Sequence, residues 1–230
     1  MTAFFTSSLF YGATISLLAY GFGLFLKKKT KLAVLNPLLI AVICVIGANQ
    51  VLSINYQTYN ESGKYLSYLL TPATVCLAVP LYEQLTLLKK NWKAVACGLL
   101  AGVLASLVGI LACAKLFRLD HQLYVTLLPK SIITAIGMGV SQELGGIVNI
   151  TVAVIIITGI LGNVIAEGVF RVFRIREPVA RGLALGNASH AVGTAKAMEL
   201  GAVEGAMSSL AIAVAGLITV VAASVFAPLA

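Results

Sequence analysis

Long uncharged stretches alternate with short clusters of charged residues along this chain. Asp, Glu, Lys and Arg are absent from the following six runs: 1–26, 32–60, 65–82, 94–114, 144–166 and 205–230. Each run reaches the length of about 18 residues at which an apolar stretch becomes a candidate transmembrane helix. A backbone inside hydrocarbon must satisfy its own hydrogen bonds, and a helix does so within one segment. The pattern therefore predicts an all-α, polytopic membrane protein with about six transmembrane helices.

Two further apolar segments are each interrupted near the middle by polar residues. Residues 121–143 are broken at Pro129–Ser131, and residues 180–201 are broken at Gly186–His190. Unpaired peptide groups find no partner in hydrocarbon, so such a break must lie inside protein or beside a water-filled cavity. Paired broken segments are typical of transporter binding sites. We therefore expect two broken or re-entrant helical hairpins, with Pro129 and Gly186 as helix-breaking residues.

Basic residues mark the ends of the predicted spans, in clusters at Lys27–Lys31, Lys89–Lys93 and Arg171–Arg181. Loops rich in Lys and Arg stay on the cytoplasmic side of a membrane. If the N-terminus is outside, all three clusters reach the cytoplasm only when residues 121–145 enter the membrane and return to the same side. The first broken segment is therefore predicted to be re-entrant. Charge leaves open whether the second is re-entrant or spanning, because no basic residue follows it.

Composition agrees with membrane insertion and gives no reason to expect a nucleic-acid partner. Hydrophobic residues make up 60% of the 230 residues, and charged residues only 10%. The 16 Lys and Arg against 8 Asp and Glu give a net charge of +8. Because the bases lie at span ends, orientation in the membrane explains this excess. We expect a multi-pass protein of the cell (plasma or inner) membrane.

A short internal repeat connects the two broken segments. At a shift of 56 residues, Ala135–Gly137 aligns with Ala191–Gly193, and Glu143–Gly145 aligns with Glu199–Gly201. Each unit then consists of a broken segment, a Glu-Leu-Gly turn and a long uncharged span. One unit starts outside and the other inside, so the two form inverted repeats. A chance match in an Ala- and Gly-rich chain is the alternative.

A third interruption contains Pro72 inside the run 65–82. A proline within a helix removes one backbone hydrogen bond and bends the segment. Such a bend would bring Thr71 and Thr74 towards the same cavity as the other two breaks. The alternative is an ordinary kinked membrane helix.

Lys130 is the candidate for binding an anion at the first break. A Lys in mid-membrane costs about 2.5–3.5 kcal/mol on insertion scales, so it should face a cavity or a counter-charge. Beside Ser131 and free backbone amides, its ammonium group would bind a carboxylate. The alternative is that the side chain extends to the membrane interface.

Asn187, Ser189 and His190 form the corresponding polar group at the second break. Amide and hydroxyl groups can donate to a carboxylate or to an oxygen beside it, and Gly186 permits close approach of the backbone. His190 could bind substrate or carry a proton, because its reference pKa lies near neutrality. The alternative is that His190 simply satisfies a neighbouring carbonyl group.

Lys196 and Glu199 are three residues apart and are predicted to form a structural ion pair on one helix face. The sequence contains no hydrolytic triad, phosphate-binding loop, dinucleotide fingerprint or metal-ligand spacing, and only two histidines. We therefore expect neither catalytic residues, nor a metal site, nor a cofactor, and the protein is not expected to be an enzyme.

Three stretches together resemble the LrgB/CidB family of bacterial membrane proteins: TPATVCLAVPLYEQ from residue 71, LLPKSIITAIGMGVSQELGGI from residue 127, and GNASHAVGTAKAMELG from residue 186. The resemblance covers nearly the whole chain and is strongest from Thr71 onwards. It implies an antiholin-like protein that acts with a small LrgA/CidA-type membrane partner to restrain murein hydrolase export and autolysis. Relatives resemble carriers of small monocarboxylates such as pyruvate, and a plastid relative exchanges glycolate and glycerate.

We therefore expect one integral membrane domain over residues 1–230, with residues 1–60 as scaffold or oligomerisation helices and residues 63–230 as an elevator-like transport core. The predicted function is secondary transport of a small monocarboxylate together with an LrgA-type partner. The chain is also expected to form a homo-oligomer, whose number of subunits the sequence does not give. The alternative is an antiholin-like regulator of murein hydrolase export and autolysis that acts on a holin-like pore.

Overall fold

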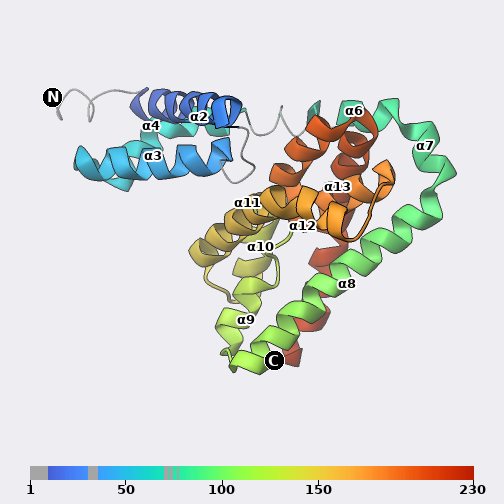
Figure 1. Ribbon diagram of the computed structural model, residues 1–230. Helices are drawn as coiled ribbons and strands as arrows, with labels where there is room; N and C mark the ends of the chain where they lie inside the picture. The colour runs from blue at the N-terminus through green and yellow to red at the C-terminus, as the bar shows by residue number, and fades with distance from the viewer. Residues whose placement is uncertain (1–9, 31–35, 70–71, 73–74, 77) are drawn as a thin grey trace. The chain divides into compact units, whose positions relative to one another are not determined.

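The computed structural model describes residues 10–30, 36–69, 72, 75–76 and 78–230, and all regular elements in these ranges are helical (Figure 1). This confirms the all-α class. The chain divides into two compact units, Met1–Cys76 and Leu77–Ala230. Whether the first part serves as a scaffold and the second as a transport core stays a prediction.

Among the described residues of the first unit, one helix packs against two others. These helices are α2 (Tyr11–Thr30), α3 (Pro37–Val51) and α4 (Tyr56–Ser67). Gly12 of α2 lies directly against α4, where its amide donates to Ser62 Oγ at 2.8 Å. Gly23 of α2 lies against the backbone of Pro37 in α3. Glycines at both contacts let the helix backbones approach closely, as in membrane helix packing.

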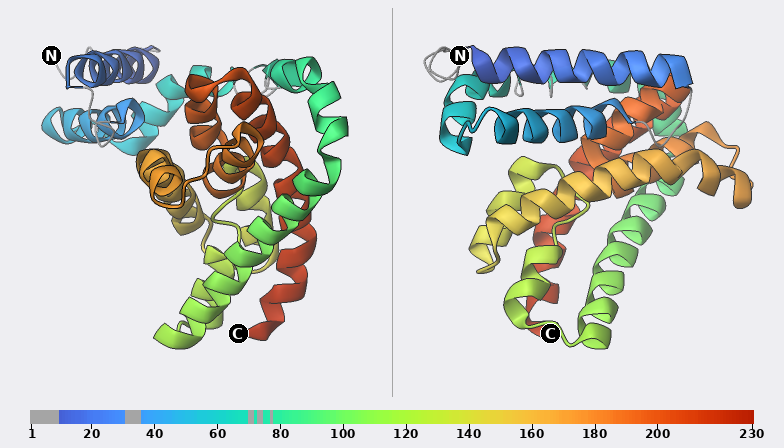
Figure 2. Two further views of the ribbon diagram at one scale, coloured as in Figure 1. Left: turned by 45° about the vertical axis from the view of Figure 1, so that its right-hand side comes forward. Right: turned by 60° about the vertical axis from the view of Figure 1, so that its left-hand side comes forward.

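The second unit contains two hairpin segments among long helices (Figures 1 and 2). In chain order its elements are α6 (Ala78–Glu83), α7 (Leu85–Lys90), α8 (Trp92–Phe117), α9 (His121–Leu127), α10 (Thr134–Glu143), α11 (Val148–Val172), α12 (Pro178–Leu200), α13 (Ala202–Phe226) and the 3-10 turn η1 (Ala227–Leu229). Helix α9 begins beside the C-terminal ends of α8 and α13, where Tyr124 Oη donates to the Phe226 carbonyl at 2.8 Å (Figure 2).

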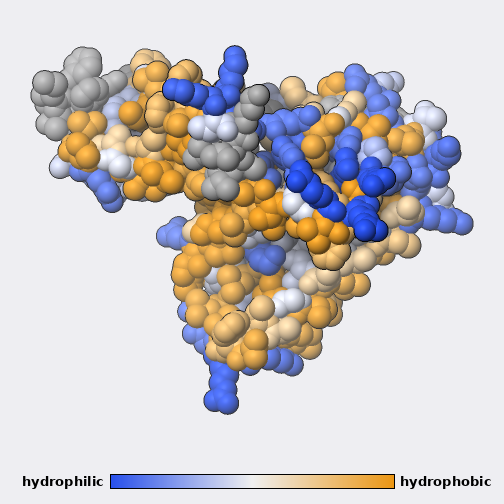
Figure 3. Space-filling view, in the orientation of Figure 1, coloured by the Kyte–Doolittle hydropathy of each residue, from blue (hydrophilic) through white to orange (hydrophobic). Residues whose placement is uncertain are grey.

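Three helices in the described part of the chain are long and apolar enough to cross a membrane: Trp92–Phe117, Val148–Val172 and Ala202–Leu229. They coincide with three of the predicted uncharged runs. Their outer faces are apolar, as on α11, where Ile150 and Ile157 are exposed. Figure 3 shows a largely hydrophobic surface over α9, α10 and α11. The protein is therefore a multi-pass membrane protein.

The three remaining predicted spans are only partly covered by the described residues. Helix α2 has 20 residues, but α3 has only 15, fewer than the roughly 20 needed to cross the hydrocarbon core. In the run from 65 to 82, the described residues comprise the end of α4, the helical positions 72, 75 and 76, and the start of α6. The total of about six transmembrane helices stays a prediction.

The first broken segment folds back on itself as a hairpin. Helices α9 and α10 are separated by a non-helical stretch from Leu128 to Ile133. Near the start of α9, Gln122 Nε2 lies 3.5 Å from the Gly145 carbonyl, and near its end Thr126 accepts a hydrogen bond from the Ile147 amide at 2.8 Å. Residues on both sides of the break therefore return to the same place, as re-entrant geometry requires.

The second broken segment is also a hairpin, and its break lies at His190. This residue has φ 42° and ψ −131° inside α12, whereas Gly186 is helical. The break therefore lies at the last residue of the predicted interval Gly186–His190, and Gly186 is not the residue that breaks the helix. A side chain at Gly186 would collide with Ser208 and Ala211 of α13, so the glycine serves close helix packing.

Both arms of the second hairpin run along α11, in opposite directions. On the way in, the Arg181 guanidinium lies 5.7 Å from the Phe170 ring centroid. The tip residue His190 lies against Gly159, near the middle of α11. On the way out, Lys196 forms an ion pair with Glu167 at 2.5 Å, close to the end of α11 where the hairpin began.

Candidate functional site

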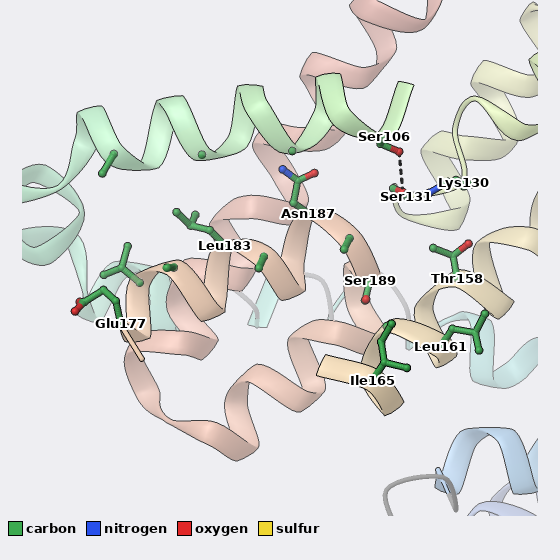
Figure 4. A pocket seen from close by; sticks show the side chains of 18 of the residues that line it. Ser106, Lys130, Ser131, Thr158, Leu161, Ile165, Glu177, Leu183, Asn187 and Ser189 are labelled. Atoms are coloured by element: carbon green, nitrogen blue, oxygen red, sulfur yellow. Dashed lines mark hydrogen bonds between the residues drawn. The ribbon is translucent and has the colours of Figure 1, made fainter. Parts of the chain in front are cut away.

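The tips of the two hairpins meet near the middle of α8. The first hairpin begins just after the C-terminal end of α8, and its Ser131 Oγ lies 3.1 Å from Ser106 Oγ (Figure 4). The second hairpin begins near the N-terminal end of α8, where Val179 and Val95 belong to one apolar cluster. Its Asn187 Nδ2 donates to the Leu99 carbonyl at 3.1 Å. The two hairpins thus approach one another along α8 from opposite ends.

A cavity of about 800 Å³ lies between these tips and extends along α8. The first tip contributes Lys130 and Ser131, and the second contributes Asn187, Ala188 and Ser189. The other walls come from the following residues of α8, α11 and the first arm of α12: Gly98, Gly102, Ser106, Thr158, Leu161, Gly162, Leu183 and Ala184. Figure 4 shows the polar tips towards one end of the cavity and Glu177 towards the other.

Lys130 is a cation without a counter-charge among the described residues. Its Nζ donates to Ser131 Oγ at 3.0 Å, and the side chain is partly buried. In the part of the chain that the structure describes, no carboxylate lies within the 4.0 Å ion-pair distance of this ammonium. A partly buried, uncompensated charge in a membrane protein favours an anionic ligand in the adjoining cavity.

Ser189 carries a buried hydroxyl with no hydrogen-bond partner. The residue is 1% exposed, and its Oγ is the one buried, unpaired side-chain polar atom found across the described residues. An unsatisfied buried hydroxyl costs about 1–3 kcal/mol. The hydroxyl lies against Gly162 of α11, which leaves room for it, and the residue lines the cavity. A ligand oxygen in the cavity would supply the missing partner.

Two helix N-termini start at the hairpin tips. Helix α10 begins at Thr134 without a side-chain cap, a few residues after Lys130. The second arm of α12 begins after the break at His190. Each helix N-terminus carries a partial positive charge of roughly +0.5. Together with Lys130 they give the tip region a positive character suited to an anion.

The side chain of His190 points from the second tip towards α11. It is buried, and its ring Nε2 lies 2.9 Å from the Ile155 carbonyl of α11. A carbonyl only accepts, so Nε2 carries a proton that it donates. His190 therefore satisfies a neighbouring carbonyl, the alternative weighed from the sequence, and it is not among the residues that line the cavity.

The remaining predicted site residues lie elsewhere or outside the described ranges. Pro129 is fully buried at the first break. Thr71 and Thr74 fall outside the described residues, and Pro72 belongs to the unit Met1–Cys76. Lys196 lies 3.4 Å from Glu199, and it also pairs with Glu167 of α11.

The sequence analysis missed the wall of the cavity that α8 provides. Gly98, Gly102 and Ser106 lie four residues apart and all line the cavity. A side chain at Gly102 would overlap the Asn187 amide, so the small residue makes room for the second tip. Small residues that repeat every four positions in an apolar helix could have indicated a face that packs closely against other helices.

The fold and this cavity define a class of protein: a multi-pass membrane protein with a polar site between two broken helical hairpins. The sequence pattern described as the LrgB-like family matches residues 16–229. The chain belongs to this family.

Similar proteins cover almost the whole chain. An antiholin-like protein LrgB of Bacillus mycoides (strain KBAB4) is 37% identical over 224 residues, which are 97% of this chain and 97% of that protein. Proteins with the same name from Bacillus cereus (strain B4264) and Bacillus anthracis (strain CDC 684 / NRRL 3495) are 36% identical with the same coverage. No solved structure matches the chain.

Proposed function

We propose that this protein is a secondary transporter of small monocarboxylates whose substrate binds between the two hairpin tips. The observation that carries this proposal is the uncompensated Lys130 in the same cavity as the unpaired hydroxyl of Ser189. A cation and an unpaired hydroxyl in one cavity form a complementary pair for a carboxylate with a neighbouring oxygen.

The polar groups suggest a division of roles. Lys130 and the two helix N-termini would neutralise the carboxylate, since each favours negative charge. Ser189 and the second N–H of Asn187 would bind the adjacent oxo or hydroxyl oxygen, because one N–H of Asn187 already bonds to α8. Ser131 holds Lys130 in position. Substrates with these features are 2-oxo or 2-hydroxy acids resembling pyruvate, glycolate and glycerate.

The cavity is much larger than a three-carbon acid, so recognition would depend on the tip region alone. The rest of the cavity would be an aqueous route along α8 towards Glu177. Alternating access would move the hairpin-bearing part of the chain against the helices of residues 1–60. This movement would be elevator-like, with an LrgA-type partner or further copies of the chain as a fixed support.

The proposal is tested by uptake of labelled pyruvate and glycolate into vesicles that contain the purified protein, with and without an LrgA-type partner. Saturable uptake is expected, and Lys130→Ala should lower it at least tenfold, because loss of the only cation at the tips leaves the carboxylate unpaired. Lys115→Ala, which removes an exposed Lys from the same unit, is the matched control. Uptake unaffected by Lys130→Ala would contradict the site.

A second candidate function is that of an antiholin-like regulator of murein hydrolase export and autolysis. It is favoured by the name of the Bacillus relatives, antiholin-like protein LrgB. A regulator needs no substrate site, and its polar tips would act as contacts with a holin-like pore. Absence of uptake with the partner present, together with changed autolysis of cells that lack the protein, would favour this function over transport.

A further inference from the structure

A second cavity, outside the hairpin tips, is bordered by four arginines. Its volume is about 330 Å³, and it lies where α11 ends and α12 begins. The arginines are Arg171, Arg174, Arg176 and Arg181. Figure 3 shows hydrophilic residues gathered over this part of the second unit. The predicted topology puts it on the cytoplasmic side.

No direct ion pair joins the four guanidinium groups to a carboxylate among the described residues, although Arg171 interacts electrostatically with Glu167. In the described ranges, none of them has a carboxylate within 4.0 Å. The acidic residue in the cavity wall, Glu167, is already paired with Lys196 at 2.5 Å. Arginines needed only to orient the chain in the membrane could point in any direction. Membrane orientation alone therefore does not explain why the four arginines line one cavity.

Part of the wall of this cavity is apolar. Phe170, Ile175 and Leu200 line it. Arg181 Nε donates to the Ile175 carbonyl at 2.9 Å, and the guanidinium lies over the Phe170 ring at cation–π distance. One arginine is therefore held in place, with its terminal N–H groups available. An ordered guanidinium loses little entropy when it binds a planar or tetrahedral anion.

Arg174 occupies a backbone position that normally requires glycine. It has φ 54° at the end of α11, where the Ile175 amide bonds to the Phe170 carbonyl at 2.8 Å and the Arg174 amide to the Arg171 carbonyl at 3.3 Å. This is the Schellman motif, whose left-handed residue is usually Gly. A side chain in this conformation is strained, as it also is at Arg118 at the end of α8, so replacement by Gly at either position relieves the backbone.

We propose that the four arginines form a binding site for a phosphoryl group. Arginine binds phosphate oxygens in a bidentate manner, and basic pockets among membrane helices on the cytoplasmic side bind phosphate head groups of lipids. The ligand is either the head group of an anionic phospholipid or a soluble phosphate ester. Its site touches the first arm of α12 through Arg181 and the end of the second arm through Leu200. Occupancy would thus join the open ends of the second hairpin, independently of any transport.

The test compares two arginine-to-glycine substitutions in the full chain. Arg174→Gly removes a guanidinium from the cavity and relieves its left-handed backbone. Arg118→Gly is the matched control, because Arg118 also has a positive φ of 51°, at the end of α8, and does not line this cavity. Binding of fluorescent phosphatidylglycerol is measured in vesicles of phosphatidylcholine, with glycerol phosphate and inorganic phosphate as competitors.

Wild type and Arg118→Gly should bind alike, and Arg174→Gly about tenfold more weakly. Arg174→Lys, which keeps the charge but not the planar fork, should be intermediate. Competition by glycerol phosphate would identify a soluble ester as the ligand, and its failure would identify the lipid head group. Equal losses in both glycine variants would show a general charge effect and overturn the proposal, as would absence of binding in wild type.

Discussion

The two hairpins solve the same problem, a sharp reversal inside apolar surroundings, in different ways. The first uses six non-helical residues, Leu128–Ile133, with Pro129 buried among them and no positive φ in the stretch. The second stays helical up to a single residue, His190, whose φ of 42° is rare for a side-chain-bearing residue. The first break is built into the sequence, whereas the second is imposed by tertiary contacts.

The two tips also differ in how far their serine hydroxyls are hydrogen-bonded. Ser131 of the first tip is fully engaged, with Ser106 on one side and Lys130 on the other. Ser189 of the second tip has no partner. The serine of the first tip is held by protein groups before any ligand arrives, whereas the serine of the second tip would gain a partner only from a ligand. The comparison suggests that the second hairpin is the one whose stability depends on occupancy of the cavity.

The largest effect is expected from Gly102→Val, which would press the second tip off α8. A side chain at Gly102 overlaps the Asn187 amide, so uptake should be lost and the free energy of unfolding reduced by about 1–3 kcal/mol. Gly109→Val is the control, because a side chain there meets open space on the same helix. Thermal unfolding and uptake of the two variants are compared. Equal behaviour would mean that α8 does not position the second tip.

A smaller effect should separate the two tip serines. Ser131→Ala breaks hydrogen bonds to Ser106 and Lys130 and should cost about 1 kcal/mol of stability. Ser189→Ala removes an unsatisfied hydroxyl, so it should leave stability unchanged or raise it by up to about 1 kcal/mol, yet weaken substrate uptake. Thermal unfolding without substrate gives both values. A clear loss of stability in Ser189→Ala would show that its hydroxyl has a partner after all.

Substitutions at His190 measure the strain at the second tip. His190→Ala loses the hydrogen bond to Ile155 and keeps the strained backbone, whereas His190→Gly loses the bond and relieves the strain. The glycine variant should therefore be more stable than the alanine variant by roughly 1–2 kcal/mol. Denaturation of the two variants under identical conditions gives the difference. Equal stabilities would mean that the tip relaxes without cost.

The smallest effect is expected for the ion pair that ties the returning arm to α11. Glu167 is half-exposed, so a double-mutant cycle of Lys196→Met and Glu167→Gln should give a coupling of only about 0.5–1 kcal/mol, decreasing with salt. The first hairpin has no such pair among the described residues, and its returning arm is joined through Thr126 and Ile147 instead. A coupling energy above about 2 kcal/mol would contradict this expectation and would show that the Lys196–Glu167 pair is shielded from water.

The sequence was most informative where composition alone decides structure. The helical class, the three longest spans and the first break follow from uncharged runs and from Pro129, because hydrocarbon and proline each leave few options. Gly186 was taken for a helix breaker, but its missing side chain serves contact with α13. A glycine in a helix and a glycine at a break look alike until the neighbouring helix is known.

The cavity wall on α8 could not be derived from local patterns. Ser106 and Gly102 acquire their role only because two hairpins reach them from opposite directions. The same holds for the position of the second break, because His190 is held by Ile155, a residue 35 positions away. Long-range pairing of this kind leaves no periodic trace in the sequence.

Helix α8 sets the distance between the two tips. It holds one at Leu99 and the other at Ser106, a separation of about 10 Å at 1.5 Å per residue. Moving the serine anchor by one turn, with Ser106→Ala and Ile110→Ser, would lengthen this interval by roughly 6 Å. The spacing of these two contacts on α8 would then determine how long a carboxylic acid must be to contact both tips, and this spacing could be changed without altering either hairpin.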